Sequence, residues 1–239
     1  MPNRLRYAYT GTAPLDLSLR QNVERVLGVV LHNGYGLTET SPTISRTLYA
    51  VGSNEVNIGT PIPGVEIKIV GSDGCEIMDG SPGELHVRGP NVMLGYFRQP
   101  ELTEAVIDKD GYLNTGDIVS VNSKQEMVVQ GRTKELIIRS GFNVYPPEIE
   151  AALNTHPAVL NSAVVGRSIE GNEEIVAFVE PVPGCHIEID TLFALLDEQL
   201  ARYKKPQKII VMSQLPVAPN GKIRKNDLKK YAEALPSFA

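Results

Sequence analysis

The chain has 239 residues, of which 28 are acidic and 23 are basic, and its formal net charge is −5. Its 42% hydrophobic and 21% charged residues exclude disorder as the dominant state, because a chain of this length can bury a sizeable apolar core. Its two cysteines, Cys75 and Cys185, exclude a disulfide scaffold, and no Cys/His spacing fits a zinc site. No apolar run approaches the roughly 18 residues of a membrane-spanning helix, and residues 1–16 lack a signal-peptide core. These features predict a cytoplasmic protein with no membrane span.

Positive charge is concentrated near the C-terminal end of the sequence. Residues 201–231 hold nine basic side chains and one acid, Asp227, so this stretch carries +8 and the rest of the chain −13. Basic tails often bind nucleic acid, but a base-stacking surface needs interleaved aromatic rings, and only Tyr203 and Tyr231 occur here. We therefore expect a solvated surface, with a local role at a phosphate group as the second alternative, and no nucleic-acid partner.

The N-terminal segment is predicted to form a strand, a helix and a second strand. Leu5–Thr10 is a short apolar run, and apolar residues then recur at helical spacing within Leu15–Leu27 before the strand Val29–His32. A strand, crossover and strand of this length favour a parallel α/β unit, and such sheets bind ligands at the carboxyl ends of their strands. The two loops that follow the strands, Gly11–Pro14 and Asn33–Pro42, are therefore the candidate ligand-binding segments.

From Thr47 to Gly131, short strands alternate with turn signals such as Asp79-Gly80 and Asp110-Gly111. This rhythm predicts an antiparallel, barrel-like block with one short helix at Glu101–Ile107. The predicted strands of this block are Val65–Val70, Gly83–Arg88, Ile118–Asn122 and Met127–Gln130.

After Arg132 the pattern indicates a compact α+β unit of normal domain size. Its predicted strands are Leu136–Arg139, Ala158–Gly166, Glu174–Glu180 and Lys208–Met212, and its predicted helices are Pro147–Asn154, Asp190–Ala201 and one from Asn226. The expected fold class is thus α/β and α+β. Residues 1–131 would form one part, divided into an α/β unit (1–46) and a barrel-like subdomain (47–131), and residues 132–239 a second domain.

The loop after the second predicted strand combines residue types that bind nucleotides. It contains Gly34, Tyr35, Gly36, Thr38 and Glu39. Glycines let the backbone approach a ligand closely, a tyrosine face can stack on a base, and one carboxylate beside phosphate oxygens suits Mg²⁺. The simpler alternative is a polar loop whose Glu39 faces water.

Three other segments carry residues that could bind a ligand, and each also has a purely structural explanation. Asp117 could bind both hydroxyls of a ribose, or it closes a turn, and Gly131–Glu135 begins 14 residues later. Ser140–Glu150 is an apolar and aromatic loop that a hydrophobic staple and a proline helix start would also explain. The tight turn at Pro219–Lys225 presents Lys222, which could also be an exposed cation of no function.

Five motifs in this order resemble the adenylate-forming superfamily of AMP-binding enzymes, which includes acyl-CoA synthetases, luciferases and the adenylation domains of peptide synthetases. The resemblance covers essentially the whole chain, and the wording of the fourth motif is closest to the fatty acyl-CoA ligases. The motifs are Gly34–Glu39, Tyr112–Asp117, Gly131–Glu135, Ser140–Pro146 and Pro219–Lys222. The resemblance implies an acid–thiol ligase that uses ATP and Mg²⁺ to adenylate a carboxylic acid, expected to be a fatty acid. The thiol of coenzyme A, the co-substrate, then displaces AMP to give a thioester.

The resemblance assigns roles to the residues of a nucleotide site. Tyr35 matches the residue that lies against adenine, Thr38 the contact to the α-phosphate, and Glu39 a ligand of Mg²⁺. Asp117 and Arg132 match the contacts to ribose. The implied nucleotide-binding set also includes Gly11, Thr12, Ala13, Gly34, Gly36 and Lys222.

Three matches concern the second domain. Lys222 matches the lysine that reaches the carboxylate and the α-phosphate in the first step, so it joins Thr38 and Glu39 as a catalytic residue. Lys134 matches the hinge about which a mobile C-terminal domain turns between the two steps. Ser140-Gly141-Phe142 matches the loop that lines the pantetheine tunnel for coenzyme A in the second step.

The chain departs from the family pattern in two ways. The family has a Gly/Ser/Thr-rich phosphate loop ending in Pro-Lys-Gly upstream of the Gly11 segment, and this sequence has none. We therefore expect a fragment, the last part of the large domain plus the whole C-terminal domain, that is inactive alone. Lys225 stands where an arginine is common, which keeps the charge but loses a bidentate contact.

Two alternatives to an acyl-CoA ligase stay open at this stage. One is a carrier-protein or amino-acid adenylating domain, which shares the first step but transfers the acyl group to a protein. The other is a non-catalytic interaction module derived from the fold. The sequence leaves open the acid and its chain length, the oligomeric state, and whether the chain forms a homodimer or associates with a missing N-terminal portion.

Overall fold

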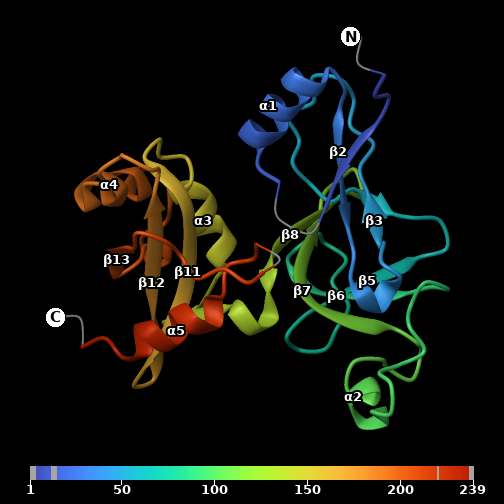
Figure 1. Cartoon of the computed structure of the whole chain (residues 1–239). Coiled ribbons are helices and arrows are strands. Elements are labelled where there is room, and N and C mark those ends of the chain that lie inside the picture. The colour runs from blue at the N-terminus through green and yellow to red at the C-terminus, as the bar shows by residue number, and fades with distance from the viewer. Residues whose placement is uncertain (1–3, 12–14, 220, 237–239) are drawn as a thin grey trace. The chain divides into compact units, whose positions relative to one another are not determined.

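The computed structural model describes residues 4–11, 15–219 and 221–236. These residues divide between Gln130 and Gly131 into two compact units, each with its own sheets and core (Figure 1). The two units are described in turn.

The first unit opens with the predicted strand, helix and strand. β1 (Ala8–Thr10) and β2 (Leu31–Tyr35) pair in parallel and are connected through α1 (Leu17–Leu27), which confirms the parallel crossover unit. β3 (Ser45–Arg46) and β4 (Thr60–Pro61) extend the sheet by antiparallel pairing, in the order β1-β2-β3-β4. The helix begins two residues later than its apolar run because the Asp16 carboxylate caps it, accepting a hydrogen bond from the Leu19 N–H at 2.8 Å.

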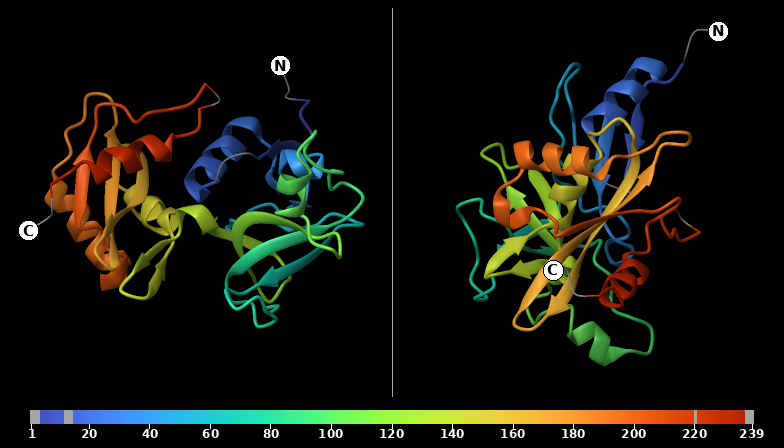
Figure 2. Two further views of the ribbon diagram at one scale, coloured as in Figure 1. Left: turned by 90° about the horizontal axis from the view of Figure 1, so that it is seen from below. Right: turned by 90° about the vertical axis from the view of Figure 1, so that its left-hand side faces the viewer.

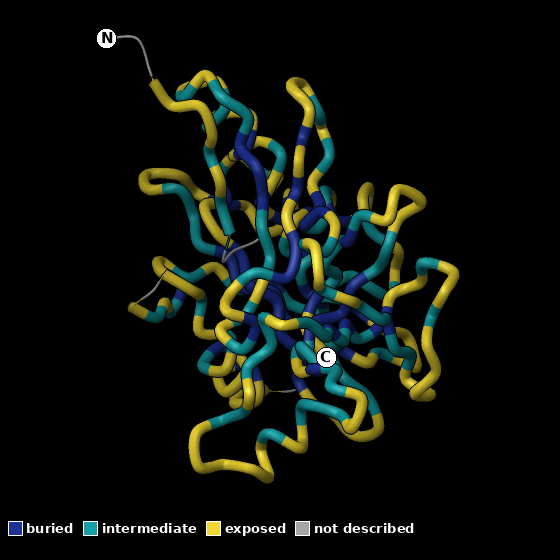
Figure 3. The backbone as a smooth tube through the Cα atoms, turned by 90° about the vertical axis from the view of Figure 1, so that its right-hand side faces the viewer, coloured by how far each residue is buried: buried dark blue, intermediate teal, exposed yellow. Residues whose placement is uncertain are grey.

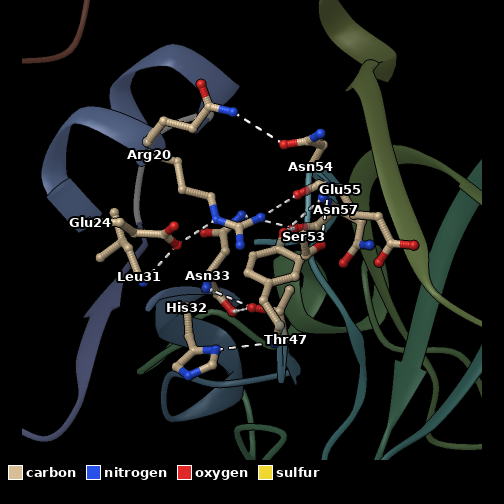
Figure 4. A network of polar contacts seen from close by, with 12 residues as sticks. Arg20, Glu24, Leu31, His32, Asn33, Thr47, Ser53, Asn54, Glu55 and Asn57 are labelled. Carbon is tan, nitrogen blue, oxygen red and sulfur yellow. Dashed lines mark hydrogen bonds and ion pairs between the residues drawn. The ribbon is translucent and has the colours of Figure 1, made fainter. Parts of the chain in front are cut away.

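Helix α1 buries a charge where its sequence pattern predicts only apolar contacts. Leu19 and Val26, two members of its apolar set, are 49% and 78% exposed, whereas Arg20 is fully buried. The Arg20 guanidinium bonds Glu24 Oε1 through Nε at 2.8 Å and the Glu55 carbonyl at 2.7 Å, as Figure 4 shows. A buried charge is tolerated only when it is paired and hydrogen-bonded, so Arg20 fixes α1 to the segment before β4.

The contacts around Arg20, which we call the Arg20 network, also reach residues of β2. The guanidinium carbon lies 3.8 Å above the centre of the Tyr49 ring, and the Tyr49 hydroxyl donates a hydrogen bond to the Asn57 carbonyl at 2.8 Å. The same carbonyl accepts a hydrogen bond from the side-chain amide of Asn33 at 3.0 Å. Glu24 Oε1 in turn accepts the N–H of Leu31, the first residue of β2, at 3.0 Å. The network therefore holds the strand whose carboxyl end carries the candidate nucleotide loop.

The second sheet of this unit contains β5 (Glu66–Val70), β6 (Gly83–Arg88), β7 (Leu113–Val121) and β8 (Met127–Arg132), in that order. β6 pairs with β5 and β7 in antiparallel fashion, as predicted. The sequence predicted a barrel-like block, and over the described residues the four strands form an open sheet with β5 and β8 at its edges. The outer side of the edge strand β5 contacts the segment that follows it in the chain, where Ile77 donates its N–H to the Ile69 carbonyl at 2.8 Å.

The core of the first unit lies on this open sheet. Its buried side chains are Ile44, Ile58, Ile69, Leu85, Val87, Leu113, Val119 and Met127, with Tyr35 and Leu37 packed against them. Buried positions follow the strands, and exposed positions gather in the loops (Figure 3). Helix α2 (Pro100–Glu104) is shorter than predicted, because the chain turns after Glu104 and Ile107 forms a bridge with Leu113.

The second unit begins with a hairpin of β9 (Ile137–Arg139) and β10 (Phe142–Val144), the second of which was not predicted. A three-stranded sheet follows, in the order β11 (Val159–Ile169), β12 (Asn172–Pro181) and β13 (Lys208–Val211). The β11–β12 pair is antiparallel and the β12–β13 pair is parallel.

Three helices cover the two faces of this sheet (Figures 1 and 2). α3 (Pro146–Leu153) and α4 (Ile189–Gln199) share one core with inward residues such as Val164 and Ala177. α5 (Lys225–Glu233) packs on the opposite face, where Val165 and Phe178 lie in a second core. The alternation of side chains along β11 and β12 thus serves two helical layers, and the predicted α/β and α+β class is confirmed.

Within the part of the chain that the structure describes, no helix combines the length and the apolar character needed to cross a bilayer.

Replacing Arg20 by alanine should destabilise the first unit strongly, because it leaves the Glu24 carboxylate without its buried cation and opens a void over Tyr49. We expect Arg20→Ala to lower the free energy of unfolding by about 3–5 kcal/mol. Arg25→Ala is the matched control, since Arg25 is exposed on the same helix, and it should cost less than about 0.5 kcal/mol. Urea unfolding, with hydrogen exchange to assign the transition to this unit, measures both; equal effects would contradict the role of Arg20.

Candidate functional site

Two glycines of the predicted nucleotide-binding set lie side by side at the carboxyl ends of β1 and β2. The parallel register pairs Thr10 with Asn33, which places Gly11 beside Gly34. A Cβ atom on Gly11 would lie 3.1 Å from the Gly34 carbonyl oxygen, and one on Gly34 would lie 2.3 Å from the Tyr9 ring. The two strand ends are therefore packed too closely for side chains at these positions. Thr12 and Ala13 lie outside the described residues.

The segment after β2 folds back on itself around a third glycine. A Cβ atom on Gly36 would lie 1.7 Å from the Pro42 carbonyl oxygen, so only glycine permits this return of the chain. The intervening residues form a 3₁₀ turn, Thr38–Thr40, whose last residue is fully buried. The Thr40 hydroxyl lies within 3.0–3.1 Å of the Leu37 and Pro42 carbonyl oxygens and accepts the Leu37 N–H. The turn is thus fixed from inside, while Thr38 is exposed.

A short hydrogen bond connects the two sheets of the first unit. The hydroxyl of Tyr35, the last residue of β2, donates to Asp117 Oδ2 at 2.5 Å. Asp117 lies in β7, 82 residues further along the chain, and is only 3% exposed. The structure therefore brings together the residues predicted to contact adenine and ribose, although they come from different sheets.

The position of Asp117 is set by the turn before it. Gly116 has a φ of 69°, a left-handed conformation that favours glycine, and its N–H donates to Asn114 Oδ1 at 2.8 Å. The Thr115 hydroxyl donates to the Leu85 carbonyl of β6 at 2.8 Å and accepts the Asp117 N–H at 3.2 Å. The Asn-Thr-Gly-Asp sequence therefore makes the bend that aims this carboxylate.

Glu39 has a hydrogen-bond partner that sequence reasoning missed. The hydroxyl of Tyr96 donates to Glu39 Oε1 at 2.9 Å, and the Met93 N–H donates to the Glu39 carbonyl at 2.8 Å. Burial and the hydrogen bond to this carboxylate raise the pKa of Tyr96 above its usual value, so Tyr96 stays a neutral donor at physiological pH. Glu39 therefore does not simply face water, as the simpler alternative held.

Asn91 is a second residue that the sequence gave no reason to select. Its side-chain amide donates to the carbonyls of Thr40 and Thr43, at 3.1 and 2.8 Å, and so connects the end of the 3₁₀ turn with the residue after Pro42. Neither Asn91 nor Tyr96 belongs to a motif, and only their position in space relates them to the loop.

The remaining predicted residues lie in the second unit, and two of them, Arg132 and Lys134, are among its first residues. Arg132 is the last residue of β8 and is exposed, and Lys134 lies at the centre of an exposed 3₁₀ turn, Thr133–Glu135. Such a single turn between two strands is a suitable place for a few residues to absorb a change of backbone angles.

The predicted coenzyme A loop is the tight turn between β9 and β10. Ser140 and Gly141 have φ values of 50° and 82°, the pair of positive angles typical of a two-residue hairpin turn. The Ser140 N–H donates to Asn172 Oδ1 at 2.7 Å, which anchors the turn to β12. Phe142 is 53% exposed and stacks on Tyr203 at 4.6 Å between ring centres. The turn therefore presents an accessible aromatic face.

Lys222 stands on a small hairpin of the second unit. Val217 and Ile223 form an antiparallel bridge, and the Ala218 N–H donates to the Lys222 carbonyl at 2.8 Å. Gly221 has a φ of 80°, and its N–H donates to the Ala218 carbonyl at 2.8 Å. Lys222 itself is exposed. The predicted tight turn is confirmed over the described residues, which exclude Asn220.

Among the described residues, no group of three or more His, Cys, Asp or Glu side chains could hold a metal ion on its own. Near the nucleotide loop the single predicted ligand is Glu39. This donor set does not fit a structural metal site, but one carboxylate fits Mg²⁺ that arrives with substrate phosphates and keeps several water ligands.

Comparison with known proteins identifies two matching family models. One, described as AMP-binding enzyme, matches residues 1–97, and the other, described as AMP-binding enzyme C-terminal domain, matches residues 148–222.

Curated relatives and solved structures match nearly the whole chain. The 4-coumarate–CoA ligase 5 of Oryza sativa subsp. japonica is 39% identical over 98% of this chain and 45% of its own length. A long-chain-fatty-acid–CoA ligase of Escherichia coli O157:H7 is 36% identical over 93% of this chain and 39% of its own length. The crystal structure of ATP-bound MatB from Rhodopseudomonas palustris has a TM-score of 0.87 and 33% identity, covering 95% of this chain and 46% of MatB. The chain thus spans less than half the length of these proteins.

Removing the Tyr35 hydroxyl tests whether its hydrogen bond holds the two sheets together. Tyr35→Phe deletes the donor at 2.5 Å from a buried carboxylate, so we expect the free energy of unfolding of the first unit to fall by about 1–3 kcal/mol. Tyr7→Phe is the control, because Tyr7 is 48% exposed, and it should change stability by less than about 0.5 kcal/mol. Thermal and urea unfolding of both variants give the comparison, and a neutral Tyr35→Phe would refute the structural role of this bond.

Proposed function

We propose, from the premise that this chain belongs to the AMP-binding enzyme family, that it carries part of the nucleotide site and the C-terminal domain of an acyl-CoA ligase. The family predicted from the five motifs is confirmed by both matching models. In this proposal the complete enzyme adenylates a carboxylic acid with ATP and then transfers the acyl group to coenzyme A. The observation that carries the proposal is the hydrogen bond between Tyr35 and Asp117, which joins the candidate adenine and ribose contacts.

In the first step an oxygen of the substrate carboxylate attacks the α-phosphorus of ATP. The bond from that phosphorus to the bridging oxygen breaks, and pyrophosphate leaves with the electron pair. Positioning and positive charge dominate such a transfer, because negative charge gathers on the phosphoryl oxygens in the transition state. We assign the positive charge to Lys222, which stands on an exposed hairpin turn, and the α-phosphate hydrogen bond to the exposed Thr38.

Most of the proposed nucleotide contacts come from the first unit. The Tyr35 ring would lie against adenine, while its hydroxyl holds Asp117. Asp117, with Arg132 at the end of β8, would bind the ribose hydroxyls, and the glycines at positions 11, 34 and 36 let backbone atoms approach the nucleotide.

Glu39 would hold Mg²⁺ together with phosphate oxygens, and Tyr96 would keep its carboxylate oriented by donating to Oε1. The ion, when bound, neutralises charge on the phosphates of ATP.

In the second step the sulfur of coenzyme A attacks the acyl carbonyl carbon and the bond to the phosphate oxygen breaks. AMP leaves with the electron pair, and the thiol proton passes to solvent. Lys222 is not needed for this step, whereas a channel for pantetheine is. We propose that a turn about Lys134 exchanges the Lys222 hairpin for the Ser140-Gly141-Phe142 turn, whose exposed aromatic face would line that channel.

The acid is proposed to be a fatty acid, because the wording of Ser140–Pro146 resembles the fatty acyl-CoA ligases and the Escherichia coli relative is named for long-chain fatty acids. An aromatic acid is the second candidate, since the rice relative of 39% identity is named for 4-coumarate. Pyrophosphate exchange with both classes of acid separates them. Transfer to free coenzyme A, rather than to a carrier protein, separates a CoA ligase from the carrier-protein alternative.

Lys222→Ala should separate the two half-reactions of the enzyme expressed from its complete gene. We expect acyl-adenylate formation to fall by about 10²–10³, the effect of losing one preorganised charge contact, while thioester formation from supplied acyl-adenylate survives. ATP–pyrophosphate exchange measures the first step, and release of AMP on adding coenzyme A measures the second. Lys222→Arg keeps the charge and should recover part of the first step. Equal losses in both half-reactions would show that Lys222 is structural.

Lys134→Pro should have the opposite effect on the same enzyme. Proline fixes φ near −65° and restricts the residue before it, so the turn at Lys134 can no longer change its backbone angles. We expect adenylation to persist and thioester formation to fall at least tenfold. Lys134→Ala, which removes the side chain but leaves the backbone free, should keep both steps. Normal overall turnover in the proline variant would remove the domain-rotation model.

A further inference from the structure

Lys225, the first residue of α5, is the meeting point of two carboxylates. Its Nζ lies 2.7 Å from Glu135 Oε2 and 2.8 Å from Glu150 Oε1, and 22% of its side chain is exposed. Burial alone would lower the pKa of Lys225, but the Glu150 and Glu135 carboxylates outweigh it and raise this pKa above its usual value. Lys225 is therefore charged under all physiological conditions. We call Glu135, Lys225 and Glu150 the triad.

The triad joins four elements of the second unit. Glu135 ends the 3₁₀ turn that begins one residue before Lys134, and Glu150 lies in α3. Glu150 Oε1 also accepts the N–H of Val164, in β11, at 2.8 Å. Through Lys225 the start of α5 is thus tied to the turn at Lys134, to α3 and to the central sheet.

Helix stability does not explain a cation at this place. The N-terminal turn of a helix carries partial positive charge, so a lysine at its first residue is electrostatically unfavourable there. Taking the ammonium and two carboxylates out of water costs further free energy, and such buried groups often contribute little net stability. What the triad does provide is a restraint on the residues around it, because Lys225 Nζ pairs with both Glu135 and Glu150.

The residue that these contacts would position is Lys222, three residues before Lys225. Residues 217–223, the Lys222 hairpin, connect to α5 through Arg224, whose N–H donates to the Pro216 carbonyl at 2.8 Å. Ile223 packs against the core under α5, beside Leu228 and Leu215. Ile223, one residue after Lys222, and Lys225, three residues after it, thus anchor the C-terminal end of the hairpin, the first by an apolar contact and the second by ion pairs.

We propose that the triad is a positioning device that sets the Lys222 hairpin relative to the hinge at Lys134. This inference rests on the proposed function, in which Lys222 acts in the first step and Lys134 is the hinge. Because Lys225 acts through Lys222, loosening the triad impairs adenylation and leaves thioester formation intact. The arginine common at this position in the family would be expected to serve as well, since it keeps the charge and can reach both carboxylates.

Lys225→Met, in the enzyme expressed from its complete gene, tests the proposal. It keeps the length of the side chain and removes the charge. We expect kcat for acyl-adenylate formation to fall about 10- to 100-fold, the effect of a small displacement of a catalytic group, with thioester formation from supplied acyl-adenylate within twofold of the parent. Glu135→Gln, a milder change, should reduce adenylation in the same selective way. Lys225→Arg, which keeps the charge, should adenylate at a rate close to that of the parent enzyme.

A double variant shows whether Lys225 acts through Lys222. If it does, Lys222→Ala with Lys225→Met is no slower in adenylation than Lys222→Ala alone. Multiplied losses would overturn the proposal, as would a Lys225→Met enzyme that loses both half-reactions equally. Lys229→Met is the matched control: Lys229 is exposed on the same helix, and both half-reactions should stay at the parental rate.

Hydrogen exchange of the 239-residue chain separates this inference from the proposed function. Lys225→Met should speed amide exchange in residues 216–224 at least tenfold, without a comparable change in β11 and β12, whereas Lys229→Met should change neither. Unchanged exchange in the hairpin would overturn the positioning role whatever the activity. Faster exchange in an enzyme that makes no acyl-adenylate from any acid would instead refute the proposed function and leave the triad as an anchor of the hairpin.

Discussion

The hydrogen bond from Tyr35 to Asp117 connects the two sheets of the first unit, and the arrangement of the candidate site depends on it. Tyr35 ends a parallel strand, and Asp117 lies in an antiparallel sheet 82 residues later. A phenol and a buried carboxylate at 2.5 Å form a charge-assisted bond, which is stronger than one between neutral groups. The bond uses the tyrosine hydroxyl, and the ring packs against the core of the first unit.

Close backbone packing supports the same region. Gly11, Gly34 and Gly36 each stand where a Cβ atom would meet a neighbouring backbone or ring at 3.1 Å or less. Thr40 and Asn91 hold the loop from inside through main-chain carbonyls, and the Arg20 network holds the strand before it. The backbone that carries the exposed groups of the loop, above all Thr38, is therefore held in place by these contacts. Catalysis by positioning requires such fixed groups.

The sequence predicted the elements well where spacing alone decides them. The parallel β1–α1–β2 unit, most later strands and the turn at Lys222 follow from apolar periodicity and from Gly, Pro and Asp at turns. Its errors have physical causes. The period of α1 marks Leu19 and Val26 as buried, but a paired Arg20 takes the interior position instead. The open second sheet could not be told from a barrel, because closure depends on pairing between edge strands and not on the pattern within each strand.

The candidate site was predictable only as separate motifs. Tyr35, Glu39 and Asp117 could be selected from their residue types and their places after strands, and the family resemblance added their roles. The contacts of Tyr96 with Glu39 and of Lys225 with Glu135 and Glu150 join residues 57, 90 and 75 positions apart. No local pattern encodes such separations, so these partners emerge only from the folded chain.

The most direct test of this account is a titration of the isotopically labelled 239-residue chain with AMP, followed by NMR. The account predicts binding on the order of millimolar, with shifts of the backbone signals centred on residues 34–40 and 114–117. Tyr35→Ala, which removes the proposed adenine platform, should abolish these shifts while the signals of the second unit stay in place. Shifts confined to the second unit, or none in the two segments at saturating nucleotide, would contradict the claim that Tyr35 and Asp117 form a nucleotide site.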